Sequence, residues 1–322
     1  MRISTNQIYN NGVGGIQGLT GNLYSLQNQI STGRRIVSPQ DDPVGSAQAL
    51  LVSQSKSINE LYIKNLGSAS TKLYSLDNVL AGVDDELQNI SEKLVSAGNG
   101  SYSDAERSYI AAELKERFKN LISLANSQDG TGRYIFGGFQ STSEPFSVNA
   151  PLSSALPRYS LVAGQRSVEY NGDDGVLSLQ VGDSQSVATN ETGSAVFMRV
   201  TDSQGVPTGR SVFDAIQNAI DYLESPGAAA PIAIYSQSLS DISSALETVS
   251  RSRASVGGRL ASLETLSNVA SDRAVQYESH LSDIKDLDYA KALTEVTKKK
   301  TQLEAAQASF SQTAKLSLFQ YI

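Results

Sequence analysis

The sequence predicts a mainly α fold: a long antiparallel coiled-coil or helical-bundle rod built from both chain ends, with an inserted β-rich domain. Three observations support this prediction. Apolar residues alternate at steps of three and four on both sides of the middle of the chain, which is typical of a coiled-coil seam. The middle itself, residues 139–210, lacks this period and has short runs typical of strands. Both ends carry helical seams but almost no charge.

The first predicted helix has no charged side chain between residues 3 and 33. Its narrow apolar seam consists of Ile16, Leu19, Leu23, Leu26 and Ile30. Each glycine in the 12–21 segment weakens a helix by about 1 kcal/mol relative to alanine, so residues 12–15 are expected to be flexible. We expect this helix to form fully when neighbouring copies cover its seam. An ordinary bundle within one chain is the alternative.

The end of the last predicted helix, which is expected near residues 289–318, resembles the first helix in its lack of charge. Lys315 is the one charged residue in 305–322. Uncharged side chains suit a helix that packs on several sides, since no charge is then buried. We therefore predict that both ends pack against other chains. In the last helix the predicted assembly residues are Leu303, Phe310, Leu316 and Leu318.

Two long heptad seams lie between these ends. A turn at Asp41 and Asp42 precedes the first; Asp42 is predicted to cap the helix and Pro43 to be its first residue. Capping is preferred here over a pair of catalytic carboxylates. The first seam, from 66 to 94, is Leu66, Ala69, Leu73, Leu76, Leu80, Val83, Leu87, Ile90 and Leu94. The second runs from 235 to 284, and each seam can be the other's partner.

The chain is predicted to have three parts. Residues 1–38 and 288–322 are the terminal assembly helices. Residues 39–138 and 211–287 form the helical rod, with a small β-hairpin that includes a strand at 133–136. Residues 139–210 are the β-rich outer domain, in which 171–175 are expected to connect strands at 167–170 and 176–181 as a hairpin.

The composition argues against several functional classes. The 322 residues include no cysteine and one histidine, His280, so cysteine or Ser-His chemistry and cysteine-ligated metals are not expected. The net charge of −7 argues against nucleic acid binding. No run reaches the ~18 apolar residues of a membrane span, and polar residues 1–11 make a cleaved signal peptide unexpected. We predict no catalytic, cofactor-binding or metal-binding residue, and no enzymatic activity.

Several motifs carry a resemblance to the bacterial flagellin superfamily. In the N-terminal half they are LQNQISTGRRI at 26–36, SPQDDPV at 38–44 and GRYIFGG at 132–138. In the C-terminal half they are DLDYA at 286–290, LEAAQASF at 303–310 and LSL at 316–318. The likeness covers about residues 1–140 and 211–322. Within the family, Pro43 resembles the members at the hook–filament junction, whereas filament flagellins usually carry small residues there.

The resemblance implies a structural protein of the extracellular bacterial flagellum, exported unfolded through the flagellar type III apparatus. It implies a layer of copies of the chain between the first hook-associated protein and the flagellin filament. The terminal helices would form an inner tube, and a flagellar export chaperone would cover the C-terminal helix before export. A filament-forming flagellin is the alternative, and a secreted enzyme or adhesin-like protein acting through 139–210 is a third hypothesis.

Overall fold

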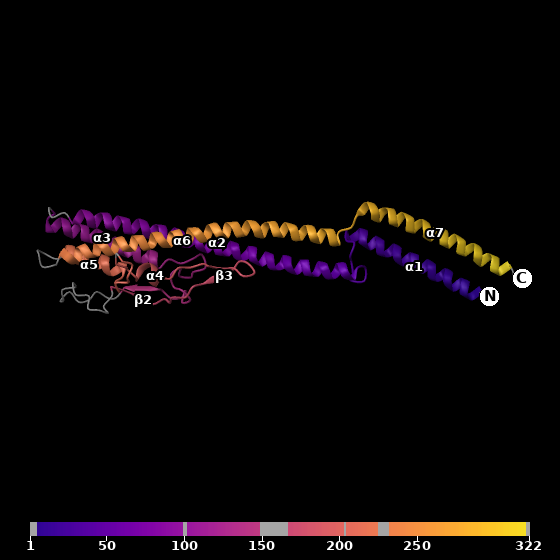
Figure 1. Cartoon of the computed structure of the whole chain (residues 1–322), viewed down its shortest axis with the longest axis horizontal. Helices are drawn as coiled ribbons and strands as arrows, with labels where there is room; N and C mark the ends of the chain where they lie inside the picture. Colours follow the sequence, from indigo (N-terminus) through magenta and orange to yellow (C-terminus); the bar gives the residue numbers. More distant parts are fainter. Residues whose placement is uncertain (1–4, 99–101, 149–166, 203, 225–231, 320–322) are drawn as a thin grey trace. The chain divides into compact units, whose positions relative to one another are not determined.

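The computed structural model describes residues 5–98, 102–148, 167–202, 204–224 and 232–319. This part is mainly α, as predicted (Figure 1). Its helices are α1 (Thr5–Thr32), α2 (Pro43–Ala97), α3 (Asp104–Ala125), α4 (Gly193–Phe197), α5 (Val212–Glu224), α6 (Ile232–Lys285) and α7 (Tyr289–Phe319). Its strands are β1 (Phe146–Val148), β2 (Val168–Tyr170), β3 (Ser178–Gln180) and β4 (Ser186–Ala188).

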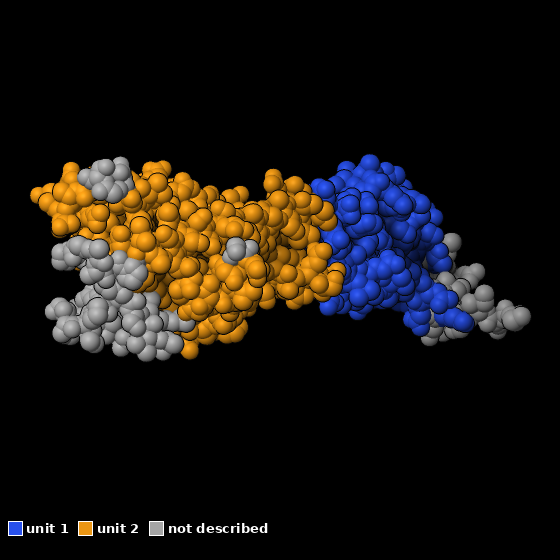
Figure 2. Space-filling model, turned by 60° about the vertical axis from the view of Figure 1, so that its left-hand side comes forward, with its two compact units in different colours: residues 1–60, 271–322 blue, residues 61–270 orange. Residues whose placement is uncertain are grey.

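The chain divides into two compact units, coloured separately in Figure 2. Unit 1 contains residues 1–60 and 271–322, and unit 2 contains residues 61–270. The three-part domain division expected from the sequence stays a prediction. Some expected element ends, at 99–100, 225–227 and 320–322, lie outside the described residues.

The core of unit 2 is built on the seam of α2. Every residue predicted for this seam, from Leu66 to Leu94, is at most 2% exposed. These side chains share one hydrophobic cluster with residues of α3, α5 and α6. The heptad period therefore identified the buried face of α2 correctly, because a step of three and four keeps side chains on one side of a helix.

Helices α2 and α6 run antiparallel within unit 2. The buried hydroxyl of Tyr235, near the start of α6, donates a hydrogen bond to the carbonyl of Leu94, near the end of α2. Burial raises the pKa of Tyr235 to about 12, so this donor stays protonated at neutral pH. Further along α6, the Arg253 guanidinium lies 3.5 Å from carboxylate oxygens of Asp77 and Asp84. This arginine of α6 is thus paired with two carboxylates of α2.

Two shorter helices complete the bundle of unit 2. Helix α3 begins at a capping box, in which Ser103 and Glu106 satisfy each other's backbone amides. It packs against α5, and the rings of Phe118 and Phe213 meet edge to face with centroids 6.0 Å apart. Helix α5 is buried along most of its length, which its apolar sequence explains.

The strands pair differently from the hairpin expected at 171–175. Strand β2 pairs antiparallel with β1, and β3 pairs antiparallel with β4, so the 171–175 segment connects two separate two-stranded sheets. The expected strand at 133–136 is also wrong, since this segment makes only an isolated bridge between Gln128 and Tyr134. Three-residue strands carry too little alternation to reveal their partners.

The described residues of segment 139–210, which was predicted to be an outer domain, contact the helices of unit 2. Asn65 of α2 donates to the carbonyl of Gln180 over 2.7 Å, and Tyr62 donates to Asp183 over 3.2 Å. On the α6 side, Arg259 forms an ion pair with Glu191. Phe146 and Phe197 belong to the same hydrophobic cluster as the α2 seam. The described strands therefore share the helical core.

Candidate assembly site in the terminal helices

Helices α1 and α7 of unit 1 lie side by side (Figure 1). All five predicted seam residues of α1, Ile16, Leu19, Leu23, Leu26 and Ile30, are half-buried. In α7, Leu303 and Phe310 are also half-buried. The side chains of Leu316 and Leu318 lie outside the described residues. Because the described seam side chains keep part of their surface open in a single chain, they remain available for contacts with other copies.

The ring of Phe310 holds α7 against the first turns of α1. Its centroid lies 5.1 Å from that of Tyr9. A β-carbon on Gly12 would lie only 2.6 Å from the Phe310 ring, so a larger residue at this position would displace the ring. Residues 12–15 are part of α1. The ring packs on Gly12, whereas β-carbons on Gly14 and Gly15 would meet nothing within 4 Å. The expectation that this segment is flexible stays a prediction.

The chain segments that follow α1 and α6 pass each other in a short antiparallel contact. The amide of Arg35 donates to the carbonyl of Lys285 over 2.7 Å, and the amide of Leu287 donates to the carbonyl of Gly33 over 3.0 Å. Gly33 has a φ of 69°, which favours glycine at the end of a helix. Arg34 and Asp286 form an isolated bridge between these segments. The end of the LQNQISTGRRI motif thus meets the DLDYA motif.

Asp42 joins this contact to the start of α2. Its Oδ1 accepts from the amide of Gly45 over 2.8 Å, which is an N-cap interaction, and Pro43 is the first residue of α2. The Gly45 amide and the Arg35 guanidinium, 3.1 Å from Asp42, lower the pKa of this carboxyl. Arg35 also donates to the carbonyl of Ile284 over 2.7 Å. One arginine therefore links α6, α2 and the turn between α1 and α2.

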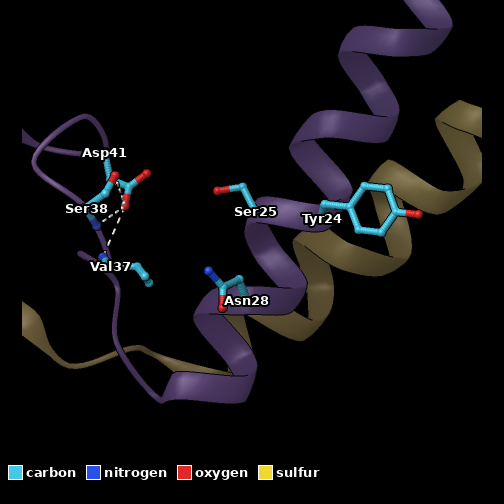
Figure 3. Close-up of a pocket in the computed structure, with 6 residues that line it drawn as sticks. All are labelled: Tyr24, Ser25, Asn28, Val37, Ser38 and Asp41. Carbon is cyan, nitrogen blue, oxygen red and sulfur yellow. Dashed lines mark hydrogen bonds between the residues drawn. The ribbon is translucent and has the colours of Figure 1, made fainter.

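Asp41 stabilises the turn before α2. Its Oδ2 accepts from the amides of Ser38 and Val37 over 2.8 and 3.1 Å. The Ser38 amide is the main reason that the pKa of Asp41 is lowered. Asp41 also borders an open hollow between this turn and α1, shown in Figure 3. The other lining residues are Tyr24, Ser25, Asn28, Val37 and Ser38.

The carboxylates of Asp41 and Asp42 accept hydrogen bonds from their own turn and helix start. Across the part of the chain that the structure describes, no three metal-ligating side chains gather into a candidate metal site. Over the same residues, no helix is long and apolar enough to cross a membrane.

The α1 seam and the turn at Asp41 and Asp42 were predicted from the sequence. The contacts that join the two ends of the chain were not. Arg35, Tyr9 and the fit of Phe310 over Gly12 were not singled out. Arg35 contacts a carbonyl 249 positions away, and no local period reveals such a pair. The unusual cluster of glycines near residue 12 was the available signal for a close helix contact.

Matches to family models cover both chain ends. Residues 3–141 match the bacterial flagellin N-terminal helical region, and residues 239–322 match the bacterial flagellin C-terminal helical region. Flagellar hook-associated protein 3 of Salmonella typhimurium is 30% identical over 334 aligned residues, and that of Escherichia coli K12 is 30% identical over 331. Each alignment covers 99% of both chains.

Solved structures share the fold. The structure of a putative flagellar hook-associated protein from Vibrio parahaemolyticus aligns with a TM-score of 0.64 at 22% identity, over 76% of this chain and 100% of that one. Flagellar hook associated protein-3 from Legionella pneumophila aligns with a TM-score of 0.61 at 21% identity, over 73% of this chain and 98% of that one.

A helical core with paired terminal helices, matched at both ends to flagellin regions, defines a structural protein of the flagellin class. The full-length identity then specifies the family within that class. The chain belongs to the flagellar hook-associated protein 3 family and has a structural role in the flagellum.

Proposed function

We propose that this chain forms the layer that joins the flagellar hook to the flagellin filament. The observation that carries the proposal is the 30% identity over 99% of the chain to flagellar hook-associated protein 3 of two species. The open seams of α1 and α7 support assembly through the terminal helices, with Ile16, Leu19, Leu23, Leu26 and Ile30 on one helix and Leu303 and Phe310 on the other. Leu316 and Leu318 belong to the same proposed surface.

The partners follow from this position. Copies of the chain form the layer, the first hook-associated protein lies on its hook side, and flagellin lies on its filament side. We propose that the chain leaves the cell unfolded through the flagellar type III apparatus, with an export chaperone on its C-terminal helix. A chain without cysteine suits this route because no disulfide can trap a folded form inside the cell.

The chain is proposed to act without catalysis and without a cofactor. A filament-forming flagellin is the weaker alternative. The flagellin of Listeria monocytogenes is 27% identical over 105 residues and aligns with 33% of this chain. That match leaves most of the chain without a counterpart, whereas the hook-associated relatives align from end to end.

Deleting the gene from the bacterium that encodes it tests the proposal. We expect cells that still build hooks but release flagellin into the medium, because the filament has no layer on which to grow. Expression of the intact chain from a plasmid should restore attached filaments. Electron microscopy of the cells and immunoblots of the medium provide the two readouts. Filaments of normal length on the deletion strain would contradict the proposed position.

A further inference from the structure

Helices α2 and α6 of unit 2 pair through apolar seams that repeat every seven residues. The α2 seam, from Leu66 to Leu94, is buried throughout. On α6 a row with a step of seven is at most 2% exposed and consists of Ile242, Val249, Val256 and Leu263. If α6 slid along α2 by seven residues, apolar side chains would again face apolar side chains. Apolar packing between these two helices therefore discriminates poorly between registers that differ by one heptad.

Arg253 brings a charge into the α6 seam, four residues after Val249 and three before Val256. Its guanidinium lies 3.5 Å from a carboxylate oxygen of Asp77 and 3.5 Å from one of Asp84. The Nε atom of Arg253 is buried and donates no hydrogen bond to any of the described residues. Burying a charged group costs desolvation energy that an aliphatic side chain at the same position would avoid. Stability alone therefore does not explain the arginine.

The two carboxylates that face Arg253 are one heptad apart on α2. A step of seven along this side of the helix joins five half-buried residues, Ile63, Ser70, Asp77, Asp84 and Ser91. The acidic members of this row are Asp77 and Asp84, and the observed register places Arg253 against both. A slide of one heptad in either direction would leave Arg253 with one aspartate and one serine of the row. A slide of two heptads would leave it with neither aspartate.

We infer that Arg253, Asp77 and Asp84 set the register of α2 against α6. The observed register is favoured because every shifted register leaves a half-buried charge with fewer partners. A polar residue in a coiled-coil seam specifies register at some cost in stability in the same way. Helices α3 and α5 pack on the same cluster and also favour the observed register, so the expected shifted forms are minor fractions. The inference concerns the fold of a single chain and does not depend on the proposed function.

Two spin labels, one on each helix, measure the register directly. The chain has no cysteine, so labels can be attached at Val95→Cys on α2 and Glu264→Cys on α6, both at exposed positions of unit 2. The purified full-length chain would be unfolded in urea, refolded and measured by pulsed electron paramagnetic resonance. At 1.5 Å per residue, a slide of one heptad moves one label by about 10 Å along the other helix. We expect one distance for the labelled chain and a resolved second distance once Arg253→Leu is added.

Arg251→Leu is the matched control for this substitution. Arg251 is exposed on the same helix, and its ion-pair partner Glu247, at 3.9 Å, belongs to α6 as well. The control therefore removes an equal charge without removing a contact to α2. It should give one distance, as the labelled parent chain does.

Moving the two carboxylates by one heptad tests the direction of the shift. Asp77→Ser combined with Ser91→Asp keeps the net charge and places the aspartates at positions 84 and 91. Arg253 then meets both only if α6 slides toward the C-terminal end of α2. This slide brings position 264 closer to position 95, so the second distance should be about 10 Å shorter than the first.

A single, unshifted distance in refolded Arg253→Leu or in the chain with moved carboxylates would overturn the inference, because other packing would then hold the register. An equal second distance in Arg251→Leu would overturn it as well. If Arg253→Leu fails to refold, the chain with moved carboxylates decides the question alone, since it keeps the arginine and both aspartates. A shorter second distance in that chain is then the result that supports the inference.

Discussion

Leu80→Ala should lower the free energy of unfolding of this chain by roughly 2–5 kcal/mol. Leu80 is 0% exposed and lies in the middle of the α2 seam, where its side chain belongs to the cluster shared with α3, α5 and α6. Truncation to alanine removes buried methyl groups and leaves a cavity that long, packed helices fill poorly. Urea unfolding followed by circular dichroism measures the loss.

Val95→Ala is the matched control for this substitution. Val95 lies on the same helix and in the same unit but is 62% exposed. Its truncation should change the free energy of unfolding by less than about 0.5 kcal/mol. If Leu80→Ala were as mild as Val95→Ala, the packing of the α2 seam against α6 would be wrong.

Leu23→Asp should block assembly of the chain into flagella while the melting temperature of unit 2 stays unchanged. Leu23 is in the middle of the α1 seam, within 31 consecutive uncharged residues, 3–33. A carboxylate buried there between copies would be desolvated without a cationic partner, at a cost of several kcal/mol. Residue 23 lies in unit 1, outside the core that determines the melting of unit 2.

Gln17→Asp controls for the added charge, because Gln17 is exposed and lies on the side of the same helix that faces away from the seam. It should leave assembly largely intact. Each variant would carry a tag, and the amount of tagged chain in sheared flagella measures assembly. Thermal melting of the purified chain measures the stability of unit 2. A large fall in the melting temperature of unit 2 with Leu23→Asp would contradict this account, because it would show that the α1 seam contributes to the fold of unit 2.

The helices were predictable because their signal is local and repeated. Nine seam residues from Leu66 to Leu94 follow one period, and all of them are buried. The strands gave no comparable signal. Strand β1 has three residues and pairs with a segment about twenty positions later, so the partner of β2 was missed and a hairpin at 171–175 was expected instead. Pairing at this distance depends on the aromatic core around Phe146, which has no sequence period.

The candidate site was predicted in part for the same reason. The α1 seam and the Asp42 cap depend on neighbours in the sequence, and their positions could be inferred directly. The contacts of Phe310 with Tyr9 and of Arg35 with Ile284 join residues from opposite ends of the chain. They depend on how α1 lies against α7 and how the two connecting segments cross, which composition and spacing do not specify.

The position of the chain in the flagellum is the central claim, and gold-labelled antibody against residues 139–210 tests it most directly. Intact flagella would be labelled and viewed by electron microscopy, with flagella from the deletion strain as the control for specificity. A layer that joins hook to filament predicts a single band of gold where the two meet. Label along the whole filament would contradict this account and would make the chain a filament subunit.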